Sequence, residues 1–148
     1  MLSRRILLGF VLVLLASGCG ALRFNRAWSS FQPDEQAGPM EGRWRGGWSS
    51  DWNGHAGGLH CVMTRQDEAS YRAWFYATYA SLLYFQYETV FRVTGVEGAT
   101  VRFDGEQDLG KTFGGLYRYE GTVAGDDFRA TFRAENGDHG TFEMKRAE

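Results

Sequence analysis

Residues 115–134 read GLYRYEGTVAGDDFRATFRA, and this stretch decides the fold. On both sides of Gly125-Asp126, apolar or small residues alternate with arginine, glutamate and threonine. A period of two is typical of a strand with one buried face. The Gly-Asp pair between the two runs favours a tight reversal of the chain. The stretch therefore predicts two antiparallel strands that share one dry face and one wet face.

The same alternation continues on both sides of this hairpin. It predicts strands over residues 41–49, 57–65, 70–79, 84–95, 99–106, 115–124, 127–134 and 139–146. Asn136-Gly137 is typical of a type I′ hairpin turn, and no convincing amphipathic helix interrupts the series. Pairing the first strand with the last would remove both open edges. We therefore expect an all-β fold, an eight-stranded antiparallel up-and-down barrel.

Two short motifs carry a resemblance to known families. Gly42-Arg43-Trp44 on the first strand and Arg146 on the last resemble the calycins, the superfamily of lipocalins and fatty-acid-binding proteins. The resemblance implies that Trp44 and Arg146 close one end of a ligand-binding barrel. A Gly-x-Trp-x-Gly-x-Trp start at 42–48 and a Gly-Gly-x-Tyr-x-Tyr-x-Gly strand at 114–121 more closely resemble uncharacterised small secreted bacterial barrels. That family implies no known activity.

The N-terminal segment is typical of a bacterial lipoprotein signal. Leu-Ala-Ser-Gly-Cys at 15–19 follows an apolar run at 6–14 and a basic start. The run is too short to span a membrane, which takes about 20 apolar residues. Small residues before the cysteine also suit an ordinary secretory signal, but Cys19 favours lipidation. Gly20 resembles the outer-membrane sorting pattern of enterobacteria, so we expect a lipid-anchored protein of the bacterial cell envelope, with the outer membrane favoured.

These features predict the organisation of the chain. Residues 1–18 are expected to be a signal peptide, 19–40 a lipidated cysteine and flexible tether, and 41–148 the barrel domain. A short helix over 22–31 is an alternative for part of the tether. Loss of two arginines with the signal leaves 14 basic and 18 acidic residues, a net charge of −4 with neutral histidines. Such a charge offers no footprint for nucleic acid. Cys61 would then have no disulfide partner, and we expect it to be buried and inert.

The lumen has two interpretations. A barrel of eight strands is just wide enough to be filled by its own side chains or to hold one small molecule. The inward positions are rich in aromatic rings, which favours a packed core. Buried tyrosine hydroxyls need partners, however, and a pocket with a polar mouth would suit a fatty acid, an isoprenoid or an aromatic metabolite. The expected lining residues are Tyr71, Phe75, Tyr87, Tyr117 and Tyr119.

Aromatic residues also occur at outward positions. Trp74 and Tyr76 share one strand, and Tyr84 lies across the predicted hairpin. Neighbouring exposed rings can form a docking surface for an envelope protein or a glycan. Such a surface module would resemble the periplasmic lysozyme inhibitors in architecture. An ordinary surface, or one covered by the tether, is the alternative.

Signals for catalysis and metal binding are weak. His55 and His60 lie near Asp51, and Asp138-His139 lies in the last predicted turn. A zinc site normally needs three or four ligands, and these residues belong to separate loops. No serine, cysteine or lysine comes with an identifiable base. We therefore expect no cofactor, no metal and no enzymatic activity, with an enzyme of calycin type as the third hypothesis after a carrier and a surface module.

Overall fold

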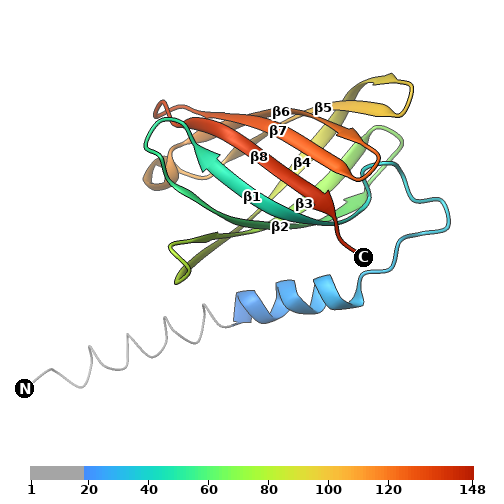
Figure 1. Cartoon of the computed structure of the whole chain (residues 1–148), viewed down its shortest axis with the longest axis horizontal. Coiled ribbons are helices and arrows are strands. Elements are labelled where there is room, and N and C mark those ends of the chain that lie inside the picture. Colours follow the sequence, from blue (N-terminus) through green and yellow to red (C-terminus); the bar gives the residue numbers. More distant parts are fainter. Residues whose placement is uncertain (1–18) are drawn as a thin grey trace, which may run out of the picture. The chain divides into compact units, whose positions relative to one another are not determined.

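The computed structural model describes residues 19–148, and the expected signal peptide lies outside them. It contains a closed barrel in which every strand pairs antiparallel with its sequence neighbour and β1 pairs with β8 (Figure 1). The predicted eight-stranded up-and-down barrel is therefore confirmed. The strands are β1 (Gly42–Ser50), β2 (Ala56–Arg65), β3 (Ser70–Tyr79), β4 (Leu83–Glu97), β5 (Thr100–Asp108), β6 (Leu116–Ala124), β7 (Asp127–Ala134) and β8 (His139–Arg146).

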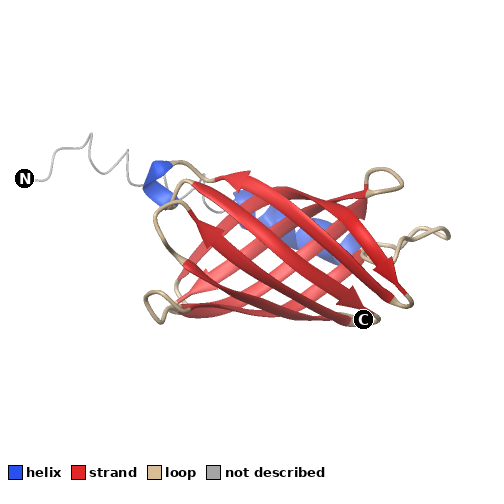
Figure 2. Ribbon diagram, turned by 90° about the horizontal axis from the view of Figure 1, so that it is seen from above, coloured by secondary structure: helices blue, strands red, loops and turns tan. Residues whose placement is uncertain are grey.

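The strands cross the barrel obliquely (Figure 2), as closure of a twisted sheet requires. Their bounds lie within two residues of the predicted ones, and the largest differences are at the ends of β4 and β5. The start of β4 at Leu83 follows a tight turn with β3 that is closed by Ala80 and Ser81, both with positive φ. The sequence there has no glycine or asparagine to mark such a turn. A second difference is the short 3-10 helix η1 (Lys111–Phe113) between β5 and β6.

The sequence predicted a flexible tether over residues 19–40, and the structure differs from this prediction. The chain divides into two compact units, Met1–Phe31 and Gln32–Glu148. In the first unit, residues 19–30 form a helix. The barrel unit begins before residue 41, because Met40 is fully buried in its core and its carbonyl accepts a hydrogen bond from Trp44 Nε1 at 3.0 Å.

No helix within residues 19–148 has the length and apolar character needed to cross a membrane.

One end of the barrel is closed by a packed core. Arg146 lies over the Trp44 ring, with its guanidinium carbon 4.3 Å from the ring centroid. Arg146 also donates to the carbonyls of Glu41, Pro39 and Gly125, so it joins the chain before β1 to the turn before β7. The pair expected from the calycin resemblance is thus in contact. Other side chains buried at this end are Met63, Phe91, Phe103, Val123, Phe128 and Met144.

Glycines let the first and last strands approach closely. A Cβ atom at Gly46 of β1 would lie 1.9 Å from the carbonyl oxygen of Glu143 in β8. A Cβ atom at Gly140 of β8 would lie equally close to the carbonyl oxygen of Ser49 in β1. Both distances are far below van der Waals contact. The seam that closes the barrel therefore depends on these two residues.

Candidate ligand pocket at the open end of the barrel

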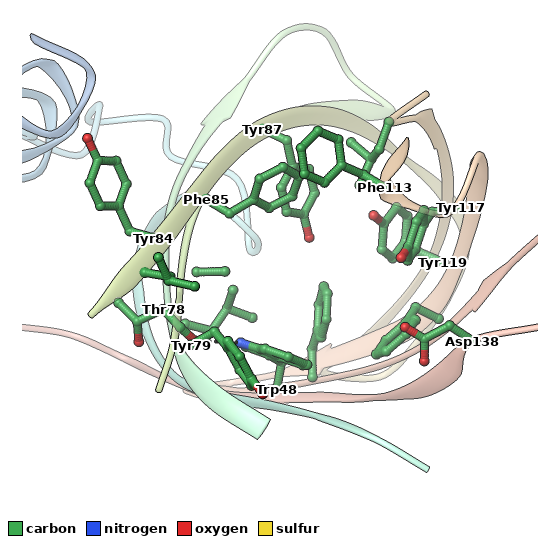
Figure 3. Close-up of a pocket in the computed structure, with 16 residues that line it drawn as sticks. Trp48, Thr78, Tyr79, Tyr84, Phe85, Tyr87, Phe113, Tyr117, Tyr119 and Asp138 are labelled. Carbon is green, nitrogen blue, oxygen red and sulfur yellow. Dashed lines mark hydrogen bonds between the residues drawn. The ribbon is translucent and has the colours of Figure 1, made fainter. Parts of the chain in front are cut away.

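The other end of the barrel is open. Loops 51–55, 80–82, 109–115 and 135–138 meet there, and a cavity of about 510 Å³ lies among the strand ends that they connect (Figure 3). This volume falls within the roughly 300–1,000 Å³ of pockets that hold small molecules. The lining residues are Trp48, Leu59, Ala77, Thr78, Tyr79, Leu83, Tyr84, Phe85, Tyr87, Leu109, Phe113, Tyr117, Tyr119, Phe132, Asp138 and Phe142.

Three tyrosines form one wall of the pocket. Tyr87 comes from β4, whereas Tyr117 and Tyr119 come from β6. Their rings are nearly parallel, with centroids 6.5 Å apart for Tyr87 and Tyr119 and 6.3 Å apart for Tyr117 and Tyr119. Figure 3 shows their hydroxyl groups inside the ring of strands. The wall therefore combines flat apolar surfaces with hydroxyl groups.

These hydroxyls stay protonated well beyond neutral pH. Burial raises the pKa of Tyr87 well above its usual value, and the neighbouring Tyr119 raises it further. Burial likewise raises the pKa of Tyr119, although its hydrogen bond with Tyr87 partly offsets that shift. Burial, then the nearby charge of Asp138, raises the pKa of Tyr117. The wall thus presents neutral groups that can donate or accept a hydrogen bond.

Trp48 forms the opposite wall (Figure 3). Its Nε1 donates a hydrogen bond of 3.0 Å to the carbonyl of Thr78, which holds the indole in place and leaves its ring for apolar contact. Tyr79 packs beside the indole, with the two ring centroids 6.3 Å apart. His55 of loop 51–55 packs against Tyr79 in turn, with the ring centroids 4.9 Å apart. The mouth of the pocket is therefore lined by rings on this side as well.

Phe75 lies beneath the pocket and is not among its lining residues. It is fully buried, stacks on Tyr87 at 5.1 Å and packs against Phe142 at 5.6 Å. Cys61 on the neighbouring strand is also fully buried, and burial raises the pKa of its thiol well above the usual value. This confirms the expected burial of Cys61, whereas its inertness stays a prediction. Below the pocket the core is packed, so the lumen is filled at one end and hollow at the other.

Asp138 is the one charged side chain among the lining residues within the described part of the chain. Its Oδ1 accepts a hydrogen bond of 2.6 Å from the Ser50 hydroxyl. Its backbone N–H donates to Asn136 Oδ1, and its carbonyl accepts from the backbone N–H of Ala134. The carboxylate is thereby held by Ser50 at the end of β1, and the backbone of Asp138 is held within the β7–β8 loop.

The structure brings together only part of the expected lining. Tyr87, Tyr117 and Tyr119 face the cavity, and Phe75 lies beneath it. The expectation for Tyr71 is wrong, because this residue lies at the closed end. A Cβ atom at Gly38 would meet the Tyr71 hydroxyl at 1.9 Å, so the ring covers the segment before β1. Alternation identified the correct face for Tyr71, but Tyr71 is the second residue of a strand that starts at the closed end.

Several pocket residues were missed from the sequence. Leu109 and Phe113 lie in the β5–β6 loop, where no periodic pattern applies. Leu82 of the β3–β4 turn is 88% exposed, Leu83 at the start of β4 is 63% exposed and Phe113 is 57% exposed, so apolar side chains surround the mouth. Pairs of apolar residues within short loops are the signal that could have found them.

Of the outward aromatic residues, Tyr84 also borders the pocket, whereas Trp74 and Tyr76 are not among its lining residues. The rings of Tyr76 and Tyr84 stack at 5.2 Å with an interplanar angle of 12°, and Trp74, Tyr76 and Tyr84 are all partly buried. Figure 3 shows the Tyr84 ring outside the ring of strands. Tyr76 and Tyr84 are thus in contact, and the role of Trp74, Tyr76 and Tyr84 as a docking surface stays a prediction.

Across residues 19–148, no three His, Cys, Asp or Glu side chains are grouped closely enough to hold a metal ion.

Comparison with known proteins supports the fold. No protein-family model matches the chain, and no curated protein sequence matches it. Among solved structures, the chain is similar to a de novo designed fluorescence-activating β-barrel, with a TM-score of 0.52, 17% identity and coverage of 82% of this chain and 97% of the other. It is also similar to a redesigned β-barrel, mFAP1, bound to DFHBI, with a TM-score of 0.55, 11% identity and coverage of 73% and 95%. This chain is a small β-barrel of the same general architecture.

Proposed function

We propose that this protein binds one small apolar or amphiphilic molecule in the open half of its barrel. The observation that carries the proposal is the cavity of about 510 Å³, walled by aromatic rings and open between the loops. A barrel filled by its own side chains would have no space there. The pocket combines a mainly apolar surface with a few hydroxyl groups, which is the usual composition of a small-molecule site.

Two further observations support a binding role. The redesigned barrel mFAP1 is described as bound to DFHBI, so a barrel of this general architecture can hold a small ligand. Among residues 19–148, those that line the pocket include no serine, cysteine, lysine or histidine. We propose a binding protein rather than an enzyme.

Native mass spectrometry of the protein purified from its own host tests the proposal directly. We expect a stoichiometric small molecule that solvent extraction removes. The variant Ala77→Phe should bind this molecule less well, because Ala77 lies on the pocket wall between Leu59 and Phe85 and a ring there would project into the cavity and take part of the space for a ligand. Ala124→Phe is the matched control, since Ala124 is exposed at the closed end of β6. Equal binding by both variants would contradict the proposed site.

We also propose that Cys19 is lipidated and anchors the barrel in the bacterial cell envelope, with the outer membrane favoured. The LASGC motif at 15–19 supports this, as does the exposed thiol of Cys19 at the start of the described helix. Expression of the full chain in a bacterial host with labelled palmitate should give a labelled membrane-associated protein. Cys19→Ser should abolish the label and release the protein from membranes. A labelled or membrane-bound Cys19→Ser variant would contradict the anchor.

A further inference from the structure

The pocket has an uneven distribution of charge. Its lining contains one carboxylate, that of Asp138, and no arginine or lysine among the described residues. The four loops at the mouth add Asp51 and Glu135 on the acidic side and Lys111 on the basic side, with His55 counted as neutral. A ligand that enters therefore passes a net negative mouth, which opposes an anion and favours a cation.

The aromatic walls act in the same direction. The negative faces of aromatic rings attract a cation within about 6 Å of the ring centroid and offer nothing comparable to an anion. Asp138 lies on the same side of the pocket as Tyr117, whose pKa it helps to raise. An anionic head group inside this pocket would have tyrosine hydroxyls as its partners and no arginine or lysine among the described lining residues. Burying a charge without an opposite charge is strongly unfavourable.

The near-parallel rings of the tyrosine wall indicate the shape of the ligand. Tyr87 and Tyr119 are inclined by 12°, and Tyr117 and Tyr119 by 20°. Such a wall offers stacked faces to a flat ring system, and aromatic stacking contributes beyond the buried area alone. The hydroxyls can donate to a carbonyl or ether oxygen at its edge.

We propose that the pocket takes a flat aromatic ligand whose polar end is uncharged or cationic, and that Asp138 excludes carboxylate-bearing amphiphiles. This inference rests on the proposed binding function and narrows it. Of the ligands expected from the tyrosine lining, it retains the aromatic metabolite and excludes the fatty acid, because a fatty acid is anionic at neutral pH. The remaining ligand class is an aromatic molecule with an alcohol, carbonyl or amine group.

Three fluorescent probes with one ring system and different charges test this inference. Pyrenemethanol, pyrenemethylamine and pyrenecarboxylic acid are neutral, cationic and anionic at neutral pH. Each is titrated against the folded mature protein at low salt, with pyrene fluorescence as the readout. We expect the alcohol and the amine to bind. The acid should bind with an affinity at least about tenfold lower, a difference in binding free energy of about 1.4 kcal/mol or more.

Asp138→Asn identifies the group responsible. This substitution should weaken binding of pyrenemethylamine, strengthen binding of pyrenecarboxylic acid and leave binding of pyrenemethanol unchanged. Asp104→Asn is the control, because Asp104 is exposed on the outer face of β5. The ratio of the affinities for the amine and the acid is then compared between the two variants. An equal ratio in Asp138→Asn and in Asp104→Asn would overturn the role of Asp138. Tightest binding of the acid to the unmodified protein would overturn the charge preference while leaving the binding function intact. Failure of all three probes to bind would contradict the proposed function itself.

Discussion

Trp44 and Trp48 provide a test of the division between a packed end and a hollow end. Both lie on the inner face of β1, four residues apart, and each indole N–H donates to a backbone carbonyl at 3.0 Å. Trp44 is fully buried between Arg146 and Phe128, whereas Trp48 lines the cavity. Replacing each with alanine removes the same atoms and the same kind of hydrogen bond. A difference in stability therefore reports the surroundings.

The expected magnitudes follow from those surroundings. Truncation of a fully enclosed tryptophan costs about 3–5 kcal/mol, because an empty cavity remains. Loss of its hydrogen bond adds about 1 kcal/mol, so we expect about 5 kcal/mol for Trp44→Ala. At Trp48 the removed volume joins a cavity that already opens to solvent. Without an enclosed void, Trp48→Ala should cost about 2–3 kcal/mol.

Urea unfolding of residues 19–148, followed by circular dichroism, measures both costs. With a slope of about 2 kcal/mol per molar urea, the midpoint should fall by about 2.5 M for Trp44→Ala and by about 1 M for Trp48→Ala. A loss of about 5 kcal/mol approaches the whole stability of many domains, so Trp44→Phe serves as a milder variant with an expected cost of about 1–2 kcal/mol. Trp48→Ala should also weaken pyrenemethanol binding, which Trp44→Phe should not. Equal costs for the two alanine variants would refute the division of the barrel into packed and hollow ends.

Three other perturbations have defined outcomes. Gly46→Ala should destabilise the barrel by about 3 kcal/mol or more, because the added Cβ would overlap a backbone carbonyl of β8. Gly47→Ala should cost clearly less in the same urea assay, because its Cβ would lie 3.1 Å from the nearest atom, the carbonyl oxygen of Gly57. Arg146→Met should cost about 2 kcal/mol through loss of its hydrogen bonds to the segment before β1, and Arg118→Met, on the exposed surface, should stay within about 0.5 kcal/mol in thermal melts. The pKa values of Tyr87 and Tyr119 are raised in the folded protein, so both hydroxyls contribute to the free energy of unfolding. This contribution is complete below the unfolded pKa of 10.0. It is lost as pH rises above that value, by about 1.4 kcal/mol per pH unit for each tyrosine. Alkaline unfolding of the Tyr87→Phe and Tyr119→Phe double variant should show a shallower slope, and an unchanged slope would contradict the burial of these hydroxyls.

The sequence predicted strand positions well because alternation is a local property. Every predicted strand appears within a few residues of its expected bounds, including the hairpin that surrounds Gly125-Asp126. The turn at Ala80-Ser81 was not recognisable, because its residues do not carry the usual preference for positive φ. Met40 was placed outside the domain for a similar reason, since a single core residue before a strand makes no periodic pattern.

The sequence alone thus determined which face of the sheet each strand residue occupies. The reason is that side chains of a strand alternate between two sides whatever the fold. The height of each residue along the barrel was decided only by the tertiary structure, because it depends on strand direction and on the register across the β1–β8 seam. Tyr71 and Tyr87 show the consequence, since both face inward and only one reaches the pocket. The loops that complete the mouth, with Phe113 and Asp138, became part of one site only when the sheet closed, because closure brings together the ends of strands that are distant in the chain.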